Sequence, residues 1–471
     1  MAGGAPRTFS WATMRNFTVA IVGGGASGTL VAAALTKRSE ATHVVIVDPR
    51  DKLGRGVAYS TECPLHLLNV PAGKISAFPD QPDHFVRWLA ANVAEPYGPA
   101  SFVPRSLYGD YLQGIAAEAQ ASATYRFRHH KALALDARVE ADGIRVTCSG
   151  GETIHADALV VASGNAAPAA WPHVSPDIQR SQRFFNSAWD DGAIVPGSRD
   201  ETVLLLGTGL TAVDAVLGLR HNGHRGTIYM VSRRGLLPHE HRVFDTPPST
   251  CPEADTVAEL LDSVRTIVRE VQIPGGNWRG VIDNVRPRTN ALWKALSLAE
   301  QRRFVRHALP YWNVHRHRIP PESAKDIAEL MASGELRMLA GRTGEIEVNE
   351  CGLRVPIKLR GSSDVLALDA GRVINCSGPQ HDSRKLANPL IQSLLAQGLM
   401  VPYPLDVGVQ VAENGAFVGA DGAPSTRLFS IGPARFGTLI ETTAIPEIRV
   451  QARELADLLC GAAMPAAKLA G

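Results

Sequence analysis

Two glycine-rich turns, widely separated along the chain, limit what this sequence can fold into. In each case an apolar run (18–22 and 202–206) is followed by closely spaced glycines, an Ala/Leu/Val-rich stretch of helix length and a second apolar run (43–47 and 227–231). This order is typical of a buried strand, a tight turn and a helix whose first N–H groups face a pyrophosphate. The flanking runs make each turn more specific than its glycines would be. We therefore predict two dinucleotide-binding units; two unrelated strand–turn–helix units are the alternative.

The residue at the end of the second strand distinguishes the two units. Asp48 follows Gly28 by about 20 residues, where a carboxylate can accept the hydroxyls of an adenosine ribose. In the second unit Ser232 takes that place, and Arg233 and Arg234 follow it with guanidinium groups suited to a 2′-phosphate. The first unit is therefore predicted to bind FAD and the second NADPH, with a solvated strand end as the alternative for the arginines. The predicted FAD contacts here are Gly23, Gly25, Ala26, Ser27, Gly28 and Asp48, and the predicted NADPH contacts are Gly207, Gly209, Leu210, Thr211, Ser232, Arg233 and Arg234.

Charge and cysteine content narrow the class of protein. The chain has 471 residues, for which about three domains are expected, and a formal net charge of only +2. This balance gives no reason to expect a nucleic acid or an anionic membrane as partner. The six cysteines form no CxxC pair, which favours a reducing, cytoplasmic location without disulfides. No apolar stretch of the sequence is long enough to span a membrane, and residues 1–16 are expected to be a disordered leader.

Two further apolar strands mark where the chain leaves and re-enters the first unit. Residues 157–162 and 372–376 each run into a small, polar Ser-Gly turn. A last strand, 428–431, precedes a Gly-Pro turn, and a closing helix is predicted to begin within 441–447. We therefore predict an α/β fold with two Rossmann-like domains: a FAD domain formed by 17–194 and 375–462, and an inserted NADPH domain formed by 195–374.

The closing strands also supply candidate cofactor contacts. A small residue beside a helix N-terminus, as at Gly432, would lie against the flavin or its pyrophosphate. An ordinary strand–helix packing unit is the alternative there. The further predicted FAD contacts are Arg50, Leu68, Ser163, Gly164 and Gly432.

Residues 252–335 interrupt the alternation of strands and helices. Helical spacing of apolar residues predicts a helical insert that is unusually rich in arginine and aromatic side chains. We predict that Arg316, Arg318 and His315 in this insert bind an anionic substrate. A solvated helix face with a few core tryptophans is an equally good interpretation. The alternating histidines here lack the spacing of further metal ligands, so no metal site is predicted.

Several segments outside the glycine turns resemble a known family. They are GRGVAY (54–59), HLLNVPAG (66–73), VSRRGLLP (231–238), WNVHRHR (312–318) and ETTAIPEIRVQA (441–452). Over nearly the whole chain they resemble the bacterial FAD/NAD(P)-binding family that includes the HpyO-type urate hydroxylase and the CreE-type aspartate N-hydroxylase.

A remoter resemblance concerns the flavin-containing and N-hydroxylating monooxygenases. Asn69 together with Phe78-Pro79-Asp80 is similar to their Asn…Phe-Pro-Asp element. Residues 184–189 stand where those enzymes carry an FxGxxxHxxxW-type signature, with Asn186 in place of its histidine. The resemblance implies that the loop carrying Asn69 lies beside the flavin ring, which makes Asn69 the candidate catalytic residue.

Together with the two nucleotide sites, the resemblance implies a FAD- and NADPH-dependent monooxygenase. NADPH would reduce the flavin, molecular oxygen would add at flavin C4a, and the hydroperoxide would hydroxylate a small, polar, nitrogen-containing substrate, urate-like or amino-acid-like. Asn69 would donate a hydrogen bond near that oxygen; an asparagine that only caps its own turn is the alternative. Two other classes of function stay open: a NADPH-dependent flavin reductase or dehydrogenase, and a redox-sensing nucleotide-binding protein without turnover.

Overall fold

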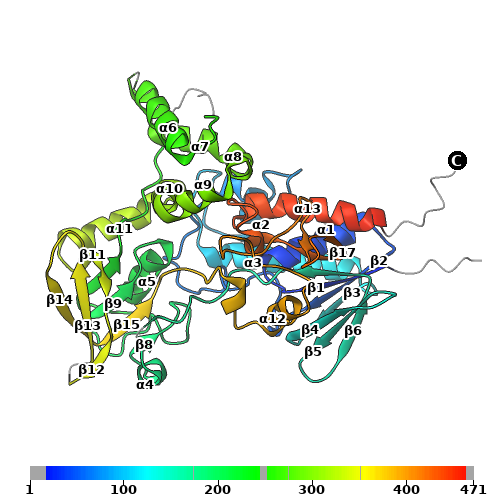
Figure 1. Ribbon diagram of the computed structural model, residues 1–471, viewed down its shortest axis with the longest axis horizontal. Helices are drawn as coiled ribbons and strands as arrows, with labels where there is room; N and C mark the ends of the chain where they lie inside the picture. Colours follow the sequence, from blue (N-terminus) through cyan, green and yellow to red (C-terminus); the bar gives the residue numbers. More distant parts are fainter. Residues whose placement is uncertain (1–16, 173, 244–251, 274, 351, 463–471) are drawn as a thin grey trace, which may run out of the picture.

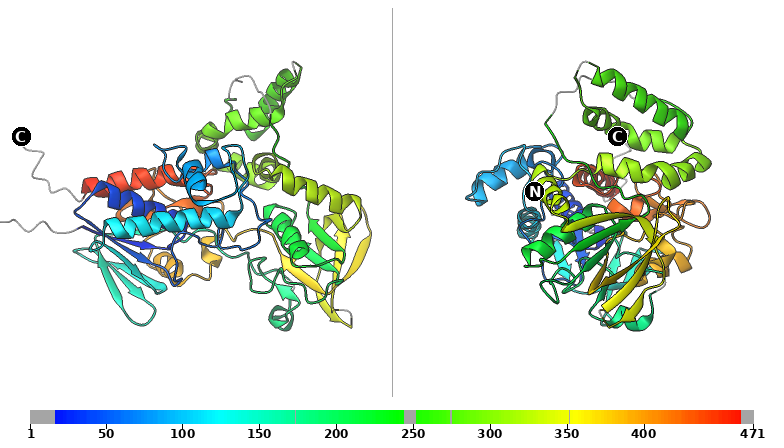
Figure 2. Two further views of the ribbon diagram at one scale, coloured as in Figure 1. Left: turned by 180° about the vertical axis from the view of Figure 1, so that it is seen from behind. Right: turned by 90° about the vertical axis from the view of Figure 1, so that its left-hand side faces the viewer.

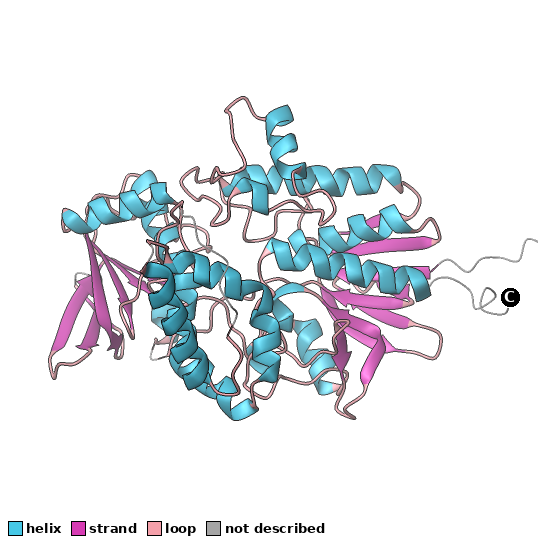
Figure 3. Ribbon diagram, turned by 90° about the horizontal axis from the view of Figure 1, so that it is seen from above, coloured by secondary structure: helices cyan, strands magenta, loops and turns pink. Residues whose placement is uncertain are grey.

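The computed structural model describes residues 17–172, 174–243, 252–273, 275–350 and 352–462. Two mainly parallel sheets lie at opposite ends of the molecule, and a group of helices projects from one side between them (Figures 1 and 3). The first sheet combines N-terminal and C-terminal segments, whereas the second is built from the middle of the chain. This arrangement confirms the predicted α/β fold class with two Rossmann-like units.

The first sheet has six strands in the order β16-β17-β7-β1-β2-β3. All neighbours are parallel except β16 and β17. Val19 and Ile21 of β1 pack into the core on one face, and Ala20 packs into the core on the other. Burial of both faces is typical of a parallel sheet covered on both sides. The strands are β1 (Phe17–Val22), β2 (Thr42–Val47), β3 (Phe127–His130), β7 (Ala158–Val161), β16 (Ala416–Val418) and β17 (Pro424–Ser430).

Different elements cover the two faces of this sheet. Helices α1, α3 and α13 lie together on one face, as the blue, cyan and red ribbons of Figure 2 show. The other face packs against α12 and a small antiparallel sheet, β4-β5-β6. The bounds are α1 (Ala26–Arg38), α3 (Arg105–Ser122), α12 (Pro389–Ala396), α13 (Ile445–Ala462), β4 (Ala134–Val139), β5 (Ile144–Cys148) and β6 (Thr153–Ala156).

The second sheet has eight strands. Its parallel part has the order β11-β10-β9-β15-β8, and β12, β13 and β14 extend it in antiparallel fashion. Leu205 of β9 faces the core shared with α5 and α11, and Leu204 faces the opposite core. The bounds are β8 (Phe184–Phe185), β9 (Val203–Leu206), β10 (Ile228–Ser232), β11 (Leu336–Thr343), β12 (Glu347–Asn349), β13 (Gly352–Leu359), β14 (Val365–Ala370), β15 (Arg372–Asn375), α5 (Leu210–His221) and α11 (Pro321–Ala332).

Strand β8 differs from its predicted domain assignment. Phe184 pairs with Val373 and Phe185 with Ile374 of β15, so both belong to the second sheet. The predicted FAD domain, 17–194, included them, because two residues carry too little periodicity to reveal which sheet they join. The chain therefore enters the second sheet before the predicted boundary, and the domain division remains our proposal with this correction.

The helical insert stands apart from both sheets, with α6 outermost (Figures 1 and 2). Thr256 and Glu259 form a reciprocal capping box at the start of α6. Asn277 caps α7 and Ser297 caps α9 through their side-chain oxygens. The insert comprises α6 (Val257–Gln272), α7 (Trp278–Val285), the 3-10 helix η2 (Arg286–Arg288), α8 (Thr289–Ala295), α9 (Leu298–Arg303), the π-helix η3 (Phe304–Ala308) and α10 (Leu309–Arg316).

Short helices occupy the remaining loops. They are η1 (Ala72–Lys74), α2 (His84–Asn92), α4 (Pro176–Arg180), η4 (Ser383–Lys385) and η5 (Gly432–Arg435). Within the described part of the chain, no helix combines the length and the hydrophobicity that crossing a membrane requires.

Candidate functional site

The first glycine turn has the close packing that the fingerprint predicts. Gly23 leaves β1 with a φ of 108°, and a Cβ there would lie 2.3 Å from the carbonyl oxygen of Ala162. A Cβ on Gly28 would lie 1.9 Å from the Gly23 oxygen. Both positions therefore require glycine: the first for the turn, the second for the contact between helix and strand.

The N-terminus of α1 has the features of an anion-binding site. Its cap residue, Gly25, makes no side-chain hydrogen bond, and the first turn contains no acidic residue. A Cβ on Gly25 would lie 3.3 Å from Cα of Gly56, so only backbone lines this approach. Ala26 and Ser27 follow at the first two helical positions. Free N–H groups at the positive end of a helix dipole suit a pyrophosphate, and the residues present fit that group.

Asp48 lies at the end of β2, but its carboxylate is fully engaged. Oδ2 accepts from the backbone N–H of Gly24 at 2.7 Å and from the guanidinium of Arg50 at 2.8 Å, and Oδ1 accepts from the backbone N and Nε of Arg50. Burial raises the pKa of Asp48, but these hydrogen bonds outweigh it and hold the pKa below its ordinary value. Recognition of a ribose by Asp48 therefore requires Arg50, whose side chain is 44% exposed, to turn outward.

The other predicted FAD contacts lie around the same turn, with one exception. Ser163 and Gly164 follow β7, and the backbone N of Ser163 would lie 3.3 Å from a Cβ on Gly23. A Cβ on Gly432, at the start of η5, would lie 2.9 Å from Oγ of Ser27. Leu68, in contrast, is 2% exposed and packs into the hydrophobic core, so its side chain contributes packing.

The second glycine turn repeats this geometry with more space. Gly207 has a φ of 133°, and a Cβ there would lie 2.4 Å from the carbonyl oxygen of Cys376. A Cβ on Gly209 would meet nothing within 4 Å. Leu210 and Thr211 begin α5, whose first turn contains no acidic residue. This helix end likewise fits a pyrophosphate.

The three residues predicted for the 2′-phosphate differ in how free they are. The Oγ of Ser232 accepts from Thr208 Oγ1 at 2.9 Å and from the backbone N of Gly235. Arg234 donates to the carbonyl oxygen of Arg306 at 3.1 Å. Arg233 is exposed and makes no ion pair with any residue that the structure describes. Arg233 can therefore bind a phosphate without rearrangement, whereas Arg234 must first break its hydrogen bond to Arg306 of the insert.

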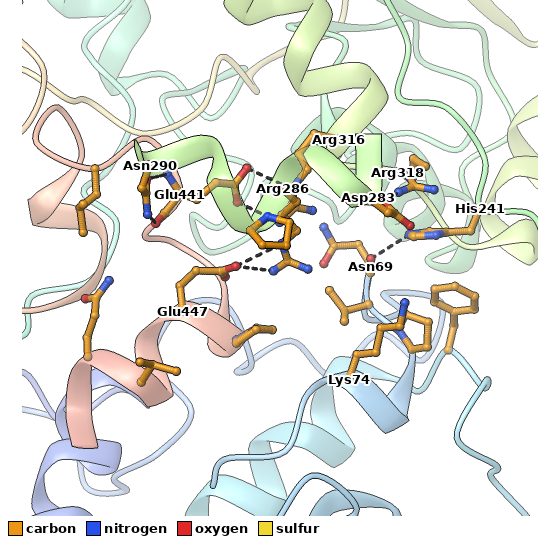
Figure 4. Close-up of a pocket in the computed structure, with 18 of the residues that line it drawn as sticks. Asn69, Lys74, His241, Asp283, Arg286, Asn290, Arg316, Arg318, Glu441 and Glu447 are labelled. Carbon is orange, nitrogen blue, oxygen red and sulfur yellow. Dashed lines mark hydrogen bonds and ion pairs between the residues drawn. The ribbon is translucent and has the colours of Figure 1, made fainter. Parts of the chain in front are cut away.

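A cavity of about 1020 Å³, hereafter the central cavity, lies between loops of the first unit and the helical insert (Figure 4). Its walls come from the loop at Asn69, from α7 and α10 of the insert, and from α13. Its polar lining residues include Asn69, Lys74, His241, Asp283, Arg286, Asn290, Arg316, Arg318, Glu441 and Glu447. Charged groups of both signs therefore surround one space.

Asn69 presents its amide at this cavity. Its side chain is half-buried and makes no hydrogen bond within the described structure. The backbone carbonyl oxygen of Asn69 accepts a hydrogen bond from Nε2 of His241 at 3.1 Å. Burial lowers the pKa of His241 to about 4, so this imidazole is neutral at pH 7. An asparagine that caps its own turn would form a hydrogen bond between its side chain and a nearby backbone group, and the described structure shows none for Asn69. His241 fixes the loop without placing a positive charge beside it.

A second set of contacts fixes the loop of Asn69 from the other side. Nε2 of the buried His66 donates to the carbonyl oxygen of Asp214 on α5 at 2.8 Å. Arg105 forms a 2.8 Å ion pair with the Asp214 carboxylate and donates through Nε to the carbonyl oxygen of Leu67. The loop is therefore tied to the helix whose N-terminus forms the second nucleotide site.

The predicted substrate residues Arg316, Arg318 and His315 are not together in one site. Arg316 lines the central cavity but is neutralised by a bidentate ion pair with Glu441, at 3.0 and 2.9 Å. His315 lines a different, apolar cavity of the insert, so the structure does not bring it together with Arg316 and Arg318. Helical periodicity explains this, because adjacent residues of α10 point in different directions.

Arg318 is the exception among these three. It is 2% exposed, pairs with Asp283 through Nη2, and leaves Nε and Nη1 without a partner among the described residues. The Oε2 atom of Glu447 is buried and also unpartnered, while its Oε1 accepts from Arg286 at 2.5 Å. Unsatisfied buried groups of this kind are rare and call for an explanation such as an absent ligand.

Sequence reasoning missed the carboxylates of this site. Glu441 and Glu447 belong to the segment at the start of α13, and each pairs with an arginine that lies far away in the sequence. Asp283 belongs to α7 and pairs with Arg318, which is closer in the sequence. No spacing rule reveals such pairs. The segment 441–447 was the one available signal, but it pointed to a helix start and to a family resemblance, not to partners for arginines. Within the described residues, no cluster of His, Cys, Asp and Glu could hold a metal ion.

Comparisons with known proteins concern the fold of the chain. Residues 20–166 match the family model described as FAD-NAD(P)-binding, which covers the first glycine turn, Asp48 and Asn69. Among curated proteins, none matches the chain in sequence. The reduced form of ornithine hydroxylase PvdA from Pseudomonas aeruginosa is 17% identical, with a TM-score of 0.63 over 94% of this chain and 98% of that one.

Two further solved structures show that proteins with different activities have a similar fold. L-lysine 6-monooxygenase from Pseudomonas syringae is 15% identical, with a TM-score of 0.64 over 95% of this chain and 99% of that one. The bacillithiol disulfide reductase Bdr from Staphylococcus aureus is 13% identical, with a TM-score of 0.56 over 95% and 99%. At these identities the likeness establishes a shared fold of flavoprotein type. Because both monooxygenases and a disulfide reductase have this fold, the chemistry must be argued from the site.

Proposed function

We propose that this chain is a FAD- and NADPH-dependent monooxygenase that hydroxylates the nitrogen of a small amino-acid-like zwitterion. The observation that carries this proposal is the central cavity. Its wall combines a free amide at Asn69 with Arg318, whose Nε and Nη1 are buried without a partner among the described residues, and Glu447, whose Oε2 is buried in the same way. These groups lie between loops of the first unit and the helical insert, in a chain that has two helix N-termini with the backbone geometry of dinucleotide sites.

The residues that would hold the two cofactors follow from the glycine turns. FAD would place its pyrophosphate at Gly25 and the N-terminus of α1, and NADPH would place its own at Gly209 and the N-terminus of α5. Arg233 would bind the 2′-phosphate, joined by Arg234 after release from the insert. When bound, the nicotinamide supplies electrons and the flavin the activation of molecular oxygen.

Charge complementarity defines the proposed substrate class. Once the side chains turn their buried atoms toward the cavity, the unpartnered N–H groups of Arg318 suit a carboxylate, and the unpartnered oxygen of Glu447 suits an ammonium group. Figure 4 shows Arg318 in the insert and Glu447 on α13, on opposite sides of the space. An amino acid satisfies both groups, whereas urate carries no ammonium. The site therefore favours an amino acid, as for the CreE-type aspartate N-hydroxylase, over the HpyO-type substrate.

The chain's own residues also control water and protons near the reacting atoms. The amide of Asn69 donates a hydrogen bond without being an acid, so it can stabilise a developing oxygen charge without protonating it. His241 has its pKa lowered to about 4 by burial and cannot act as a proton source at pH 7. This combination favours oxygen transfer over release of peroxide.

A disulfide reductase function is disfavoured by the cysteines that the structure describes. Cys63, Cys148, Cys376 and Cys460 are all free thiols. Burial raises the pKa of Cys63 and of Cys376, which makes both poor nucleophiles. Cys251 and Cys351 lie outside the described residues.

A substrate screen with the purified flavoprotein tests the proposal. Amino acids and urate are added singly, and NADPH oxidation, peroxide release and product mass are followed. The proposal expects faster NADPH oxidation with an amino acid and a product containing one added oxygen atom. NADPH oxidation with quantitative peroxide and no substrate dependence would indicate a reductase instead. Failure of NADPH to reduce the flavin at all would indicate a non-catalytic sensor.

A further inference from the structure

We propose that the helical insert contains a second small-molecule site, which binds an amphiphilic anion with an apolar body and one anionic head group. A cavity of about 830 Å³, hereafter the insert cavity, lies among α6, α7, α8, η3 and α10. Among the residues that the structure describes, none lines both this cavity and the central cavity. Its size falls within the range of roughly 300–1000 Å³ typical of ligand pockets.

The insert cavity interrupts an otherwise packed core. At one end of α6, Val257 packs with Leu296 and Ala308; at the other, Ile267 packs with Val281 in a separate cluster. The cavity runs between these two small cores. Its wall is mainly apolar and partly open to solvent, so an apolar ligand body bound there would remove that wall from water, which is favourable.

Aromatic rings form much of the wall. Trp293 is 3% exposed and is fixed by a 2.6 Å hydrogen bond from Nε1 to the carbonyl oxygen of Gly437. Trp278, Trp312 and Phe304 also line the space. Phe304 belongs to the π-helix η3, a rare element that is frequently found at functional sites. Flat, rigid rings of this kind suit an apolar ligand body.

The charges around the insert cavity have one sign. Arg265, Arg269 and Arg303 line it, and no aspartate or glutamate does so among the described residues. Arg265 and Arg269 lie one turn apart on α6, are exposed, and form no ion pair within the described structure. Arg303 is paired with Glu300 at 2.8 Å. The pair on α6 is therefore the part of the rim that suits an anionic head group.

Titration with decanoate tests the inference, with decanol as the uncharged probe of the same chain length. Quenching of the wall tryptophans and calorimetry report binding to the flavin-loaded protein without NADPH, so the result does not depend on the proposed reaction. We expect saturable binding of one decanoate per chain and at least tenfold weaker binding of decanol. Absence of saturable decanoate binding would overturn the proposal.

Two variants and a control locate the site. The double replacement Arg265→Ala and Arg269→Ala is expected to weaken decanoate binding at least tenfold and to leave decanol binding unchanged. Leu261→Trp, at a wall position that is 39% exposed, should fill the space and weaken both ligands. Arg302→Ala removes an exposed cation that does not line the cavity and should change neither. Equal decanoate affinity in all three variants would place the ligand elsewhere and reject the site.

Discussion

In the first unit Gly23 turns beneath Ala162, and in the second Gly207 turns beneath Cys376, with a hypothetical Cβ 2.3 and 2.4 Å from the respective carbonyl oxygens. Each carbonyl precedes a Ser-Gly turn whose glycine, Gly164 or Gly378, has a positive φ. The two units therefore share the same backbone geometry at the turn. Their differences lie in what surrounds the helix N-terminus.

The first unit is closed and the second is open. A Cβ on Gly25 would lie 3.3 Å from Cα of Gly56, whereas a Cβ on Gly209 would meet no atom of the described residues within 4 Å. Helix and strand approach so closely in the first unit that Gly28 is required, but Ala212 fills the same place in the second. A closed site suits a cofactor that stays bound, and an open one suits a cofactor that exchanges in every turnover. The comparison thus supports flavin in the first unit and nicotinamide in the second.

The largest expected effect concerns coenzyme selection by the second unit. Replacing Arg233 and Arg234 together by alanine should raise the KM for NADPH and leave NADH use nearly unchanged, because each guanidinium contributes roughly 1.5–3 kcal/mol to phosphate binding. Each 1.4 kcal/mol corresponds to about tenfold in affinity. The single Arg233→Ala variant should account for more of the effect than Arg234→Ala, since Arg234 must first give up its hydrogen bond to Arg306. Steady-state kinetics with both coenzymes measure this, and equal losses for NADH and NADPH would contradict it.

The next effect concerns the cavity beside the first unit. Asn69→Ala should retain FAD and its reduction by NADPH, but should divert oxygen to free peroxide. The loss of one preorganised hydrogen-bond donor typically costs about a hundredfold or more in the step it serves. Product formation and peroxide release, measured at equal NADPH consumption, report the change. His241→Gln, which keeps a donor near the Asn69 carbonyl, is the matched control; a similar loss in both variants would assign the effect to loop geometry.

A smaller effect should separate the closed unit from the open one. Gly28→Ala places a Cβ 1.9 Å from the Gly23 oxygen, and such overpacking costs about 1–3 kcal/mol. We expect reduced flavin content and a lower free energy of unfolding. The matched change in the second unit, Ala212→Gly, should cost about 1 kcal/mol and leave flavin content unchanged. Absorbance and urea denaturation measure both quantities, and retained flavin in Gly28→Ala would show that the first unit is not closed around its ligand.

The smallest effect is a pH dependence confined to the first unit. The pKa of Asp48 is lowered in the folded state, so its stabilising contribution is present above the unfolded value of about 3.9 and is lost as the pH falls through the folded value. Wild type should therefore be more stable than Arg50→Ala above pH 4, by about 1 kcal/mol or less because Arg50 is half-exposed. Urea midpoints between pH 3 and 6 should show the difference vanish at the acid end. Ser232→Ala in the second unit should show no such trend.

The sequence by itself determined the backbone of both nucleotide units. Glycine at Gly23 and Gly207 is required because the turn has a positive φ, and a required residue type is visible in the sequence. Apolar runs determined the strands for the same reason, since burial on both faces demands them. Asp48 in one unit and Arg233 in the other could also be identified as candidate contacts from the sequence, because both lie at a fixed offset from the turn.

Only the tertiary structure decided which charges remain free. Arg316 and Arg318 look alike in the sequence, but the first is neutralised by Glu441 and the second keeps unpartnered N–H groups. His315, their neighbour, faces a separate cavity. An ion pair depends on where two distant segments meet, and the energy of a charge depends on its burial and on every charge near it. Ion pairing between distant segments and the burial of a charge follow no regular spacing along the chain, so no sequence pattern predicts them.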